Sequence, residues 1–173
     1  NVCKATQKLK QQGANIVMMF CSVSFPALRK AGVITPAALL EHAALAMRNQ
    51  GCIGVLQPIK EMMEQEIQHW KALGVPVVHA YAPPLAPGSP ENPQVDESIR
   101  NAPDEHLIRA ARSLVEQGAE VIVLDCFGYG DHHRKLVFGA TGKPVIQPTS
   151  YIGVALDSMY CLGANKQAGA MSA

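Results

Sequence analysis

The chain has 173 residues, with 15 Lys and Arg against 14 Asp and Glu, and 48% of its residues are hydrophobic. This length allows one large domain or two small ones around an ordinary hydrophobic core. Because the charge is nearly balanced and no basic stripe is interleaved with aromatic residues, nucleic acid is not an expected partner.

The chain also lacks the sequence signals of export and of membrane insertion. No apolar run approaches the roughly 18 residues of a membrane span, and residues 1–12 are polar and basic rather than signal-like. We therefore expect a cytoplasmic protein without a membrane partner. The chain does not begin with Met and opens directly on a helical pattern, so further residues are expected upstream.

The first fifty residues predict a helix, a strand and a second helix. A surface helix is expected over residues 2–12, closed by Gly13, and the apolar run 14–20 predicts a buried strand. Cys21 stands where that strand ends. An Ala- and Leu-rich helix should then run over residues 35–50, because proline is favoured in the first turn of a helix.

From residue 52 onward, predicted strands alternate with predicted helices. Strands are expected over 52–56, 75–81, 120–125 and 145–146, and helices over 61–73, 104–117 and 149–162. Continuously apolar strands that alternate with helices indicate a parallel sheet covered on both faces. The proline-rich stretch 82–93 predicts a loop, either a lid or, as we favour, a rigid connector, and residues 163–173 predict a disordered tail.

The chain resembles itself at a constant offset. Gly13-Ala14, a strand and Cys21 match Gly118-Ala119, a strand and Cys126, all 105 residues apart. After an insertion of seven residues, 33–36 matches 145–148. Several matches in the same order predict two pseudo-symmetric halves. Residues 1–51 would be the C-terminal part of an incomplete first half, and 52–162 the second half, whose last helix could pack back on the first.

Equivalent halves of this kind direct the carboxyl ends of their strands toward a common crevice. We therefore expect Cys21 and Cys126 to face each other. Two thiols on opposite faces of a substrate can remove a proton from a carbon on one side and return one on the other. The thiolate base needs positive potential, and backbone N–H groups after each strand would supply it and bind a carboxylate. The residues concerned are Ser22, Val23, Ser24, Phe127, Gly128 and Tyr129.

Five cysteines are present, an odd number without CxxC spacing, which fits neither a disulfide framework nor a zinc site. A cysteine outside a disulfide usually serves as a small core hydrophobe, and this interpretation is favoured for Cys3, Cys52 and Cys161. Asp125 directly precedes Cys126 and should face the other way if the strand alternation persists, so a structural hydrogen bond is at least as well supported as catalysis.

Several further side chains have two open interpretations. His79 and Tyr81 end the third expected strand, so they either line the cleft or serve only the strand. His133 follows a glycine-flanked turn and either delivers an imidazole to the cleft or caps a surface helix. Thr149 and Ser150 are either carboxylate donors or caps of the last helix. The six histidines show no HxxxH or HxH pattern, so no metal site is expected.

The sequence GAEVIVLDCFGY over residues 118–129, followed by HRKL at 133–136 and PVI at 144–146, resembles the AroM family of the aspartate/glutamate/hydantoin racemase superfamily. The resemblance covers residues 15–162. It implies two flavodoxin-like subdomains, each with a cysteine at the end of an equivalent strand, and racemisation without pyridoxal phosphate. Relatives isomerise or decarboxylate small carboxylic acids. Cys21 and Cys126 fall on the two cysteine positions.

One departure from that pattern concerns the residues after each cysteine. Racemases of the superfamily usually have Asn-Thr after the first cysteine and Thr-His after the second, whereas Ser22-Val23 and Phe127-Gly128 stand here. Our leading hypothesis is a racemase or isomerase for a small carboxylate-bearing substrate that uses no cofactor. The alternative is a non-catalytic small-molecule binding protein on the same scaffold, and a homo-oligomer is compatible with either.

Overall fold

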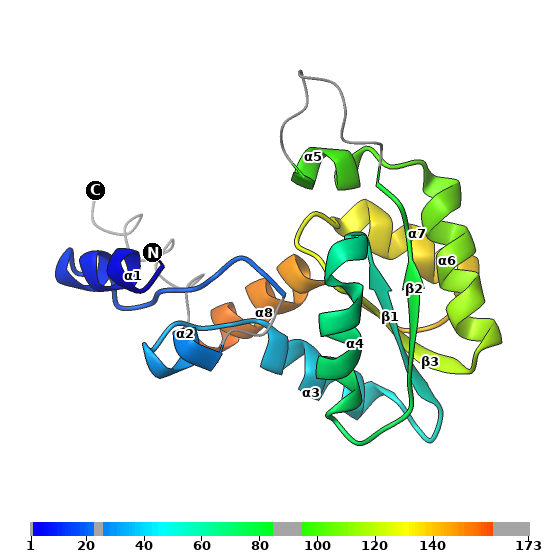
Figure 1. The fold of residues 1–173 in the computed structure, drawn as a ribbon, viewed down its shortest axis with the longest axis horizontal. Coiled ribbons are helices and arrows are strands. Elements are labelled where there is room, and N and C mark those ends of the chain that lie inside the picture. The colour runs from blue at the N-terminus through cyan, green and yellow to red at the C-terminus, as the bar shows by residue number, and fades with distance from the viewer. Residues whose placement is uncertain (1, 23–25, 85–94, 161–173) are drawn as a thin grey trace, which may run out of the picture.

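The computed structural model describes residues 2–22, 26–84 and 95–160, and its centre is a four-stranded parallel sheet (Figure 1). The strand order is β2-β1-β3-β4. The strands are β1 (Cys52–Gln57), β2 (Val77–Tyr81), β3 (Ala119–Leu124) and β4 (Val145–Ile146). The predicted α/β class with a parallel sheet is confirmed, and each of these four strands was expected.

The two central strands are buried on both faces of the sheet. In the register of β1 and β3, Val55 lies opposite Val123 and Leu56 opposite Leu124, and all four side chains are fully buried. Side chains alternate along a strand, so Leu56 and Leu124 enter one core cluster while Val55 and Val123 enter the other. This burial on two faces explains why the strands appear in the sequence as continuous apolar runs.

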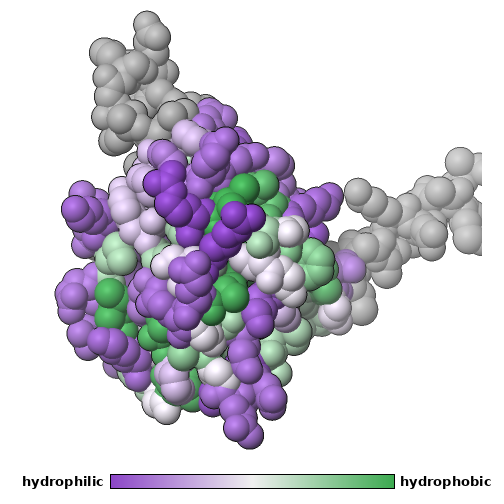
Figure 2. Space-filling model, turned by 90° about the vertical axis from the view of Figure 1, so that its right-hand side faces the viewer, coloured by the Kyte–Doolittle hydropathy of each residue, from purple (hydrophilic) through white to green (hydrophobic). Residues whose placement is uncertain are grey.

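Two pairs of helices cover the two faces. The first cluster is closed by α6 (Asp104–Glu116) and α7 (Asp131–Thr141). The second is closed by α3 (Ala37–Met47) and by α4 (Met63–Lys71), which follows the short 3₁₀ turn η1 (Lys60–Met62). The side of the molecule on which α6 lies is mainly hydrophilic (Figure 2), as expected for an amphipathic helix whose apolar stripe faces the sheet.

The N-terminal region contains α1 (Val2–Gln11) and α2 (Pro26–Lys30) but no regular strand. The strand predicted over 14–20 is wrong: one isolated parallel bridge joins Met18 to Ile34, and Phe20 is 71% exposed. Among the residues that the structure describes, this segment pairs only around Ile34, and one short partner does not bury both faces of a strand.

The few contacts of this segment nevertheless follow the sequence repeat. The repeat equates Met18 with Val123 and Ile34 with Ile146, and Val123 pairs with Ile146 in the β3–β4 ladder just as Met18 pairs with Ile34.

The glycines that precede the two segments also match. Gly13 has φ 93° and Gly118 has φ 95°, a left-handed conformation that favours glycine at both places. The correspondence that the sequence suggests therefore extends to local backbone geometry.

Two helices link the expected halves, and three helices were not expected. The helix α3 belongs to residues 1–51 but packs on β3 and β4, and α8 (Pro148–Tyr160) contacts α3. The helices α2, α5 (Val95–Arg100) and α7 were missed, and α5 lies above the carboxyl ends of the strands (Figure 1). Most of the predicted loop 82–93 and the tail 163–173 lie outside the described residues. None of the helices within the described ranges is long and apolar enough to cross a membrane.

Candidate functional site

The segments that carry Cys21 and Cys126 lie side by side. The rings of Phe20 and Phe127 meet edge to face with centroids 5.5 Å apart. On the other side of the cysteines, the Ser22 side chain reaches the Asp125 carboxyl and acts there as a hydrogen-bonding neighbour. The residues on both sides of Cys21 thus contact the residues on both sides of Cys126. Both cysteines are half-buried, and the four described cysteines are thiols rather than disulfides.

The sulfur of Cys126 accepts a hydrogen bond from the backbone. The Gly128 N–H donates to Cys126 Sγ over 3.4 Å, and the Tyr129 N–H donates to the Cys126 carbonyl oxygen over 3.3 Å. A donor aimed at sulfur favours the thiolate over the thiol. Of the residues expected to supply positive potential there, Gly128 thus directs its N–H at the sulfur, whereas the Tyr129 N–H is used by the Cys126 carbonyl oxygen.

This turn is held from above by α5. A Cβ atom at position 128 would lie 3.0 Å from Ile99, which is itself 1% exposed. Only glycine allows Ile99 to pack so closely on the turn, since any side chain there would force the helix or the turn to move. The helix α5 is thus part of the site's support, although no periodic signal in its six residues predicted it.

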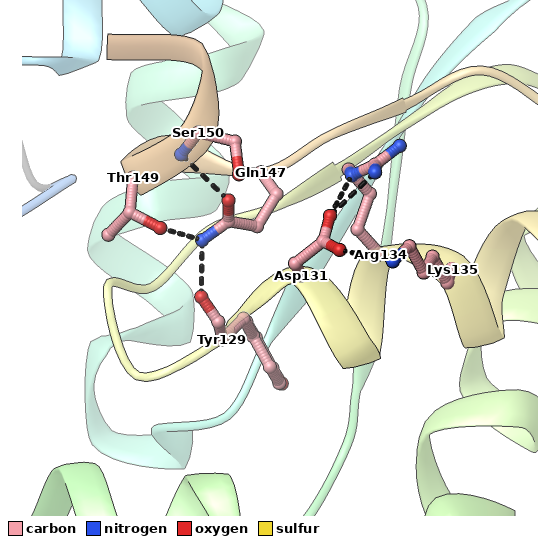
Figure 3. Close-up of polar contacts among 7 residues, drawn as sticks. All are labelled: Tyr129, Asp131, Arg134, Lys135, Gln147, Thr149 and Ser150. Atoms are coloured by element: carbon pink, nitrogen blue, oxygen red, sulfur yellow. Dashed lines mark hydrogen bonds and ion pairs between the residues drawn. The ribbon is translucent and has the colours of Figure 1, made fainter. Parts of the chain in front are cut away.

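A buried glutamine holds the same turn from the side (Figure 3). Gln147 is 1% exposed, and its Nε2 donates both to the Tyr129 carbonyl and to the Thr149 hydroxyl. Its Oε1 accepts the Ser150 N–H over 2.9 Å. Sequence reasoning missed Gln147; the signal was its position at the end of β4, where the repeat has the equally buried Thr35.

Thr149 and Ser150 lie in the first turn of α8 and both are exposed. Their contacts with Gln147 give them a structural role at the helix start, and exposure leaves the Ser150 hydroxyl accessible. Near them, Asp131 forms surface ion pairs with Arg134 and Lys135 (Figure 3). These ion pairs stabilise the first turn of α7, and their three residues are not among the predicted site residues.

Asp125 faces the opposite side of the sheet from Cys126, as the strand alternation predicts. Cys126 packs against the cluster under α6 and α7, whereas Asp125 Oδ2 accepts a hydrogen bond from Trp70 Nε1 at 3.2 Å on the side of α4. Burial raises the pKa of Asp125, and the Ser22 and Trp70 side chains oppose this rise. The structural hydrogen bond proposed for Asp125 is present.

A second buried carboxyl group, which the sequence analysis did not identify, accompanies Asp125. Glu66 of α4 is 1% exposed, and burial followed by the charge of Asp125 raises its pKa to about 7. Beside it, His69 Nε2 lies 2.7 Å from Glu41 Oε1, and that hydrogen bond raises the pKa of His69. The one sequence signal was a glutamate on the face of α4 that also carries the core residue Trp70.

His133 does not face the cysteine pair. It is 4% exposed and lines a small closed cavity with Tyr129 and Ile99 beneath α5. The Gly130 N–H donates to His133 Nδ1 over 2.9 Å, so the ring proton resides on Nε2, and burial lowers the pKa of His133. Of the residues that line this cavity, Tyr129 interacts electrostatically with Cys126. Burial is the main cause that raises the pKa of Tyr129, and the charge of Cys126 adds to it.

His79 and Tyr81 lie along the edge strand β2, away from the cysteines. His79 pairs in register with Val55 and so faces the α3 and α4 side, where burial lowers the pKa of His79 to about 4. Tyr81 lines an open cavity of about 370 Å³ between β2 and α6, and neither Cys21 nor Cys126 lines it. The structure therefore does not bring these two residues into the cysteine site.

Two predicted binding residues, Val23 and Ser24, lie outside the described residues. Ser22, which precedes them, is buried and contacts Asp125 rather than facing solvent. No group of three or more His, Cys, Asp and Glu side chains in the described ranges is arranged to hold a metal ion.

Comparison of the chain with known families matches it to one of them. The family described as AroM protein matches residues 1–159. The chain belongs to the AroM family. No curated protein matches it.

Solved structures of two racemases and a decarboxylase share the fold of this AroM-family protein. Glutamate racemase RacE1 from Bacillus anthracis has a TM-score of 0.61 and 16% identity over 93% of this chain. Unliganded arylmalonate decarboxylase has a TM-score of 0.62 and 18% identity over 87% of this chain and 70% of its own. Allantoin racemase from Klebsiella pneumoniae has a TM-score of 0.59 and 23% identity over 94% of this chain and 66% of its own. The chain spans 65% of the glutamate racemase chain.

Proposed function

We propose that this AroM-family protein is a cofactor-independent racemase or isomerase for a small carboxylate-bearing substrate, with Cys21 and Cys126 as its acid/base pair. The observation that carries the proposal is the double contact of Phe20 with Phe127 and Ser22 with Asp125, which flanks both cysteines. The likeness in fold to two racemases and a decarboxylase supports it.

The mechanism uses two thiols and no other acid or base. One cysteine, as thiolate, takes the proton from the substrate carbon, so that a C–H bond breaks and an S–H bond forms. The electron pair left on carbon is delocalised toward the adjacent carboxyl group. The other cysteine then gives its proton to the opposite face of that carbon and becomes the thiolate. The Gly128 N–H, 3.4 Å from Cys126 Sγ, favours the thiolate state there.

Solvent hydrogen exchange tests the proposal without knowledge of the substrate. Small amino acids and dicarboxylic acids are incubated with the protein in deuterated water, because a thiol exchanges its proton with solvent between turnovers. A true substrate should gain deuterium at the reacting carbon. Cys21→Ser and Cys126→Ser should each abolish net inversion, since a hydroxyl is a far weaker acid than a thiol, while each retains ligand binding.

The alternative is a non-catalytic carboxylate-binding protein on the same scaffold. The departures from the racemase pattern at Ser22-Val23 and Phe127-Gly128 favour it, because those positions follow the cysteines directly. A ligand that binds tightly but gains no deuterium, together with two thiols that titrate near the ordinary value, would replace the enzyme proposal with this one.

A further inference from the structure

Two buried carboxyl groups lie on the α4 side of the sheet, opposite the cluster against which Cys126 packs, and the mechanism above does not use them. Asp125 is 2% exposed and Glu66 is 1% exposed. Each leaves one oxygen, Asp125 Oδ1 and Glu66 Oε2, buried without a hydrogen-bond partner. A buried carboxylate without full compensation is costly, so a pair of this kind requires an explanation.

The surroundings of the pair come from α4, α3 and the Cys21 segment. Trp70 of α4 donates to Asp125 Oδ2, and the Ser22 side chain reaches the same carboxyl from the Cys21 segment. The other charged groups that act on the pair are Glu41 of α3 and His69 of α4, which are joined by a 2.7 Å contact. Since that contact combines a carboxylate with a histidine whose pKa is raised, it adds little net charge.

Glu66 lies one helical turn before Trp70 on the buried face of α4, and Trp70 binds Asp125, so both carboxyl groups belong to one buried site. Two carboxyl groups in such a site do not both ionise readily, because each charge opposes the other. Hydrogen-bond donors favour the charged form, and the donors around this pair, Trp70 and Ser22, act on Asp125. The proton therefore resides on Glu66, whose pKa is raised to about 7 by burial and by the charge of Asp125. At neutral pH the pair is close to losing that proton.

We propose that Glu66 and Asp125 form a buried carboxyl pair that holds a single proton, limits the negative charge behind the two cysteines and, through Ser22, ties the Cys21 segment to the end of β3. The proposal rests on the proposed function, in which these cysteines form thiolates. Glu66 and Asp125 are positioning residues, since they act through their neighbours and do not touch the substrate.

Cysteine alkylation against pH tests the proposal in the intact chain. Iodoacetamide alkylation of Cys21 and Cys126 is followed by peptide mass spectrometry at pH 6 and pH 8, with the exposed Cys3 as the internal reference. The variant is Glu66→Gln, which cannot ionise and so mimics the protonated glutamate. The matched control is Glu64→Gln, an exposed glutamate of the same helix that contacts only Gln68 among the described residues.

At pH 6 Glu66→Gln and wild type should alkylate at the same rate, because Glu66 is still protonated. At pH 8 the wild-type pair carries two negative charges that oppose thiolate formation. Alkylation of Cys126 should then be roughly three- to tenfold faster in Glu66→Gln than in wild type, as expected for a charge removed at close range. Glu64→Gln should follow wild type at both pH values, and Ser22→Ala should change the rate at Cys21 more than at Cys126.

Equal rates for Glu66→Gln and wild type at both pH values, or the same offset at both, would overturn the proposal, because a structural defect acts at every pH. If Glu66→Gln fails to fold, infrared difference spectroscopy of wild type decides: the carbonyl band of a protonated carboxyl group should be present at pH 6 and lost by pH 8, and its absence at pH 6 would contradict the pair. An alkylation shift without any solvent exchange would leave the carboxyl pair standing and refute the racemase.

Discussion

Two regions of this molecule have the same sequence pattern and very different support. Cys126 follows β3, a strand whose residues 121–124 are fully buried between two helix-covered clusters. Cys21 follows a segment held by one bridge at Met18, with the exposed Phe20 next to it. The glycine at the start of each segment and the bridge in its middle correspond, yet only one segment is a strand.

The difference shows that an apolar run becomes a strand only when neighbours bury both its faces. The Cys21 segment instead takes its position from contacts with the other region, namely Phe20 with Phe127 and Ser22 with Asp125. We therefore expect the Cys126 region to determine overall stability and the Cys21 region to follow it. Four predictions test this relation.

The largest effect should come from core residues of matching position in the two regions. Leu124→Ala should lower the free energy of unfolding by about 3 kcal/mol, because Leu124 is fully buried and a cavity remains. Met19→Ala, at the matching position of the half-buried Cys21 segment, should cost about 1 kcal/mol or less. Denaturant unfolding followed by circular dichroism measures both. Similar losses for the two variants would mean that the regions are equally well supported.

The second prediction concerns how the stability of the protein depends on pH through the buried carboxyl group of Glu66, which lies outside the Cys21 segment. The folded-state pKa of Glu66 is about 7 against an ordinary value of 4.5, so the native state binds more protons between these values. Stability should therefore fall as pH rises from about 4.5 to 7, by about 3 kcal/mol from this residue. Denaturant midpoints from pH 4.5 to 8 measure the fall, and Glu66→Gln should lack this part of it. A parallel curve for the variant would place the pH dependence elsewhere.

The third prediction concerns the turn that follows Cys126. Gly128→Ala should destabilise the protein by about 1 to 2 kcal/mol, because its Cβ would lie 3.0 Å from Ile99. It should also change the alkylation rate of Cys126, whose sulfur accepts the Gly128 N–H. The matched control is Gly139→Ala in α7, where nothing lies within 4 Å, and which should stabilise by about 0.5 to 1 kcal/mol. Equal effects of the two variants would show that α5 does not pack on the turn.

The smallest effect should come from the aromatic contact between the regions. A double-mutant cycle of Phe20→Ala and Phe127→Ala should give a coupling energy of about 0.5 to 1 kcal/mol, the range of an edge-to-face pair. Cys21 alkylation should rise in Phe20→Ala, because the segment then loses one of its two contacts. A coupling energy of zero would indicate that the Phe20 contact does not hold the regions together in solution.

Elements with their own periodic pattern could be predicted from the sequence. The sequence predicted the four sheet strands, α3, α6 and α8 within a few residues of their observed bounds. A strand buried on two faces produces a continuous apolar run, and a helix buried on one face produces a periodic apolar pattern. The helices α2, α5 and α7 were missed because α2 and α5 are short and α7 carries the mixed sequence DHHRKLVFGAT, in which few apolar residues recur.

The candidate site divides in the same way. The sequence by itself determined the family, the α/β class, the two cysteine positions and the alternation that turns Asp125 away from Cys126. Each of these depends on the pattern of neighbouring residues in the sequence or on the internal repeat. Only the tertiary structure decided that Glu66 and Asp125 are buried on the same side of the sheet, that Gln147 holds the turn after Cys126, and that His79 and His133 lie away from the cysteines. Such contacts join residues far apart in the chain, and the partner of a buried polar group is set by the packing of helices on the sheet rather than by its neighbours in sequence.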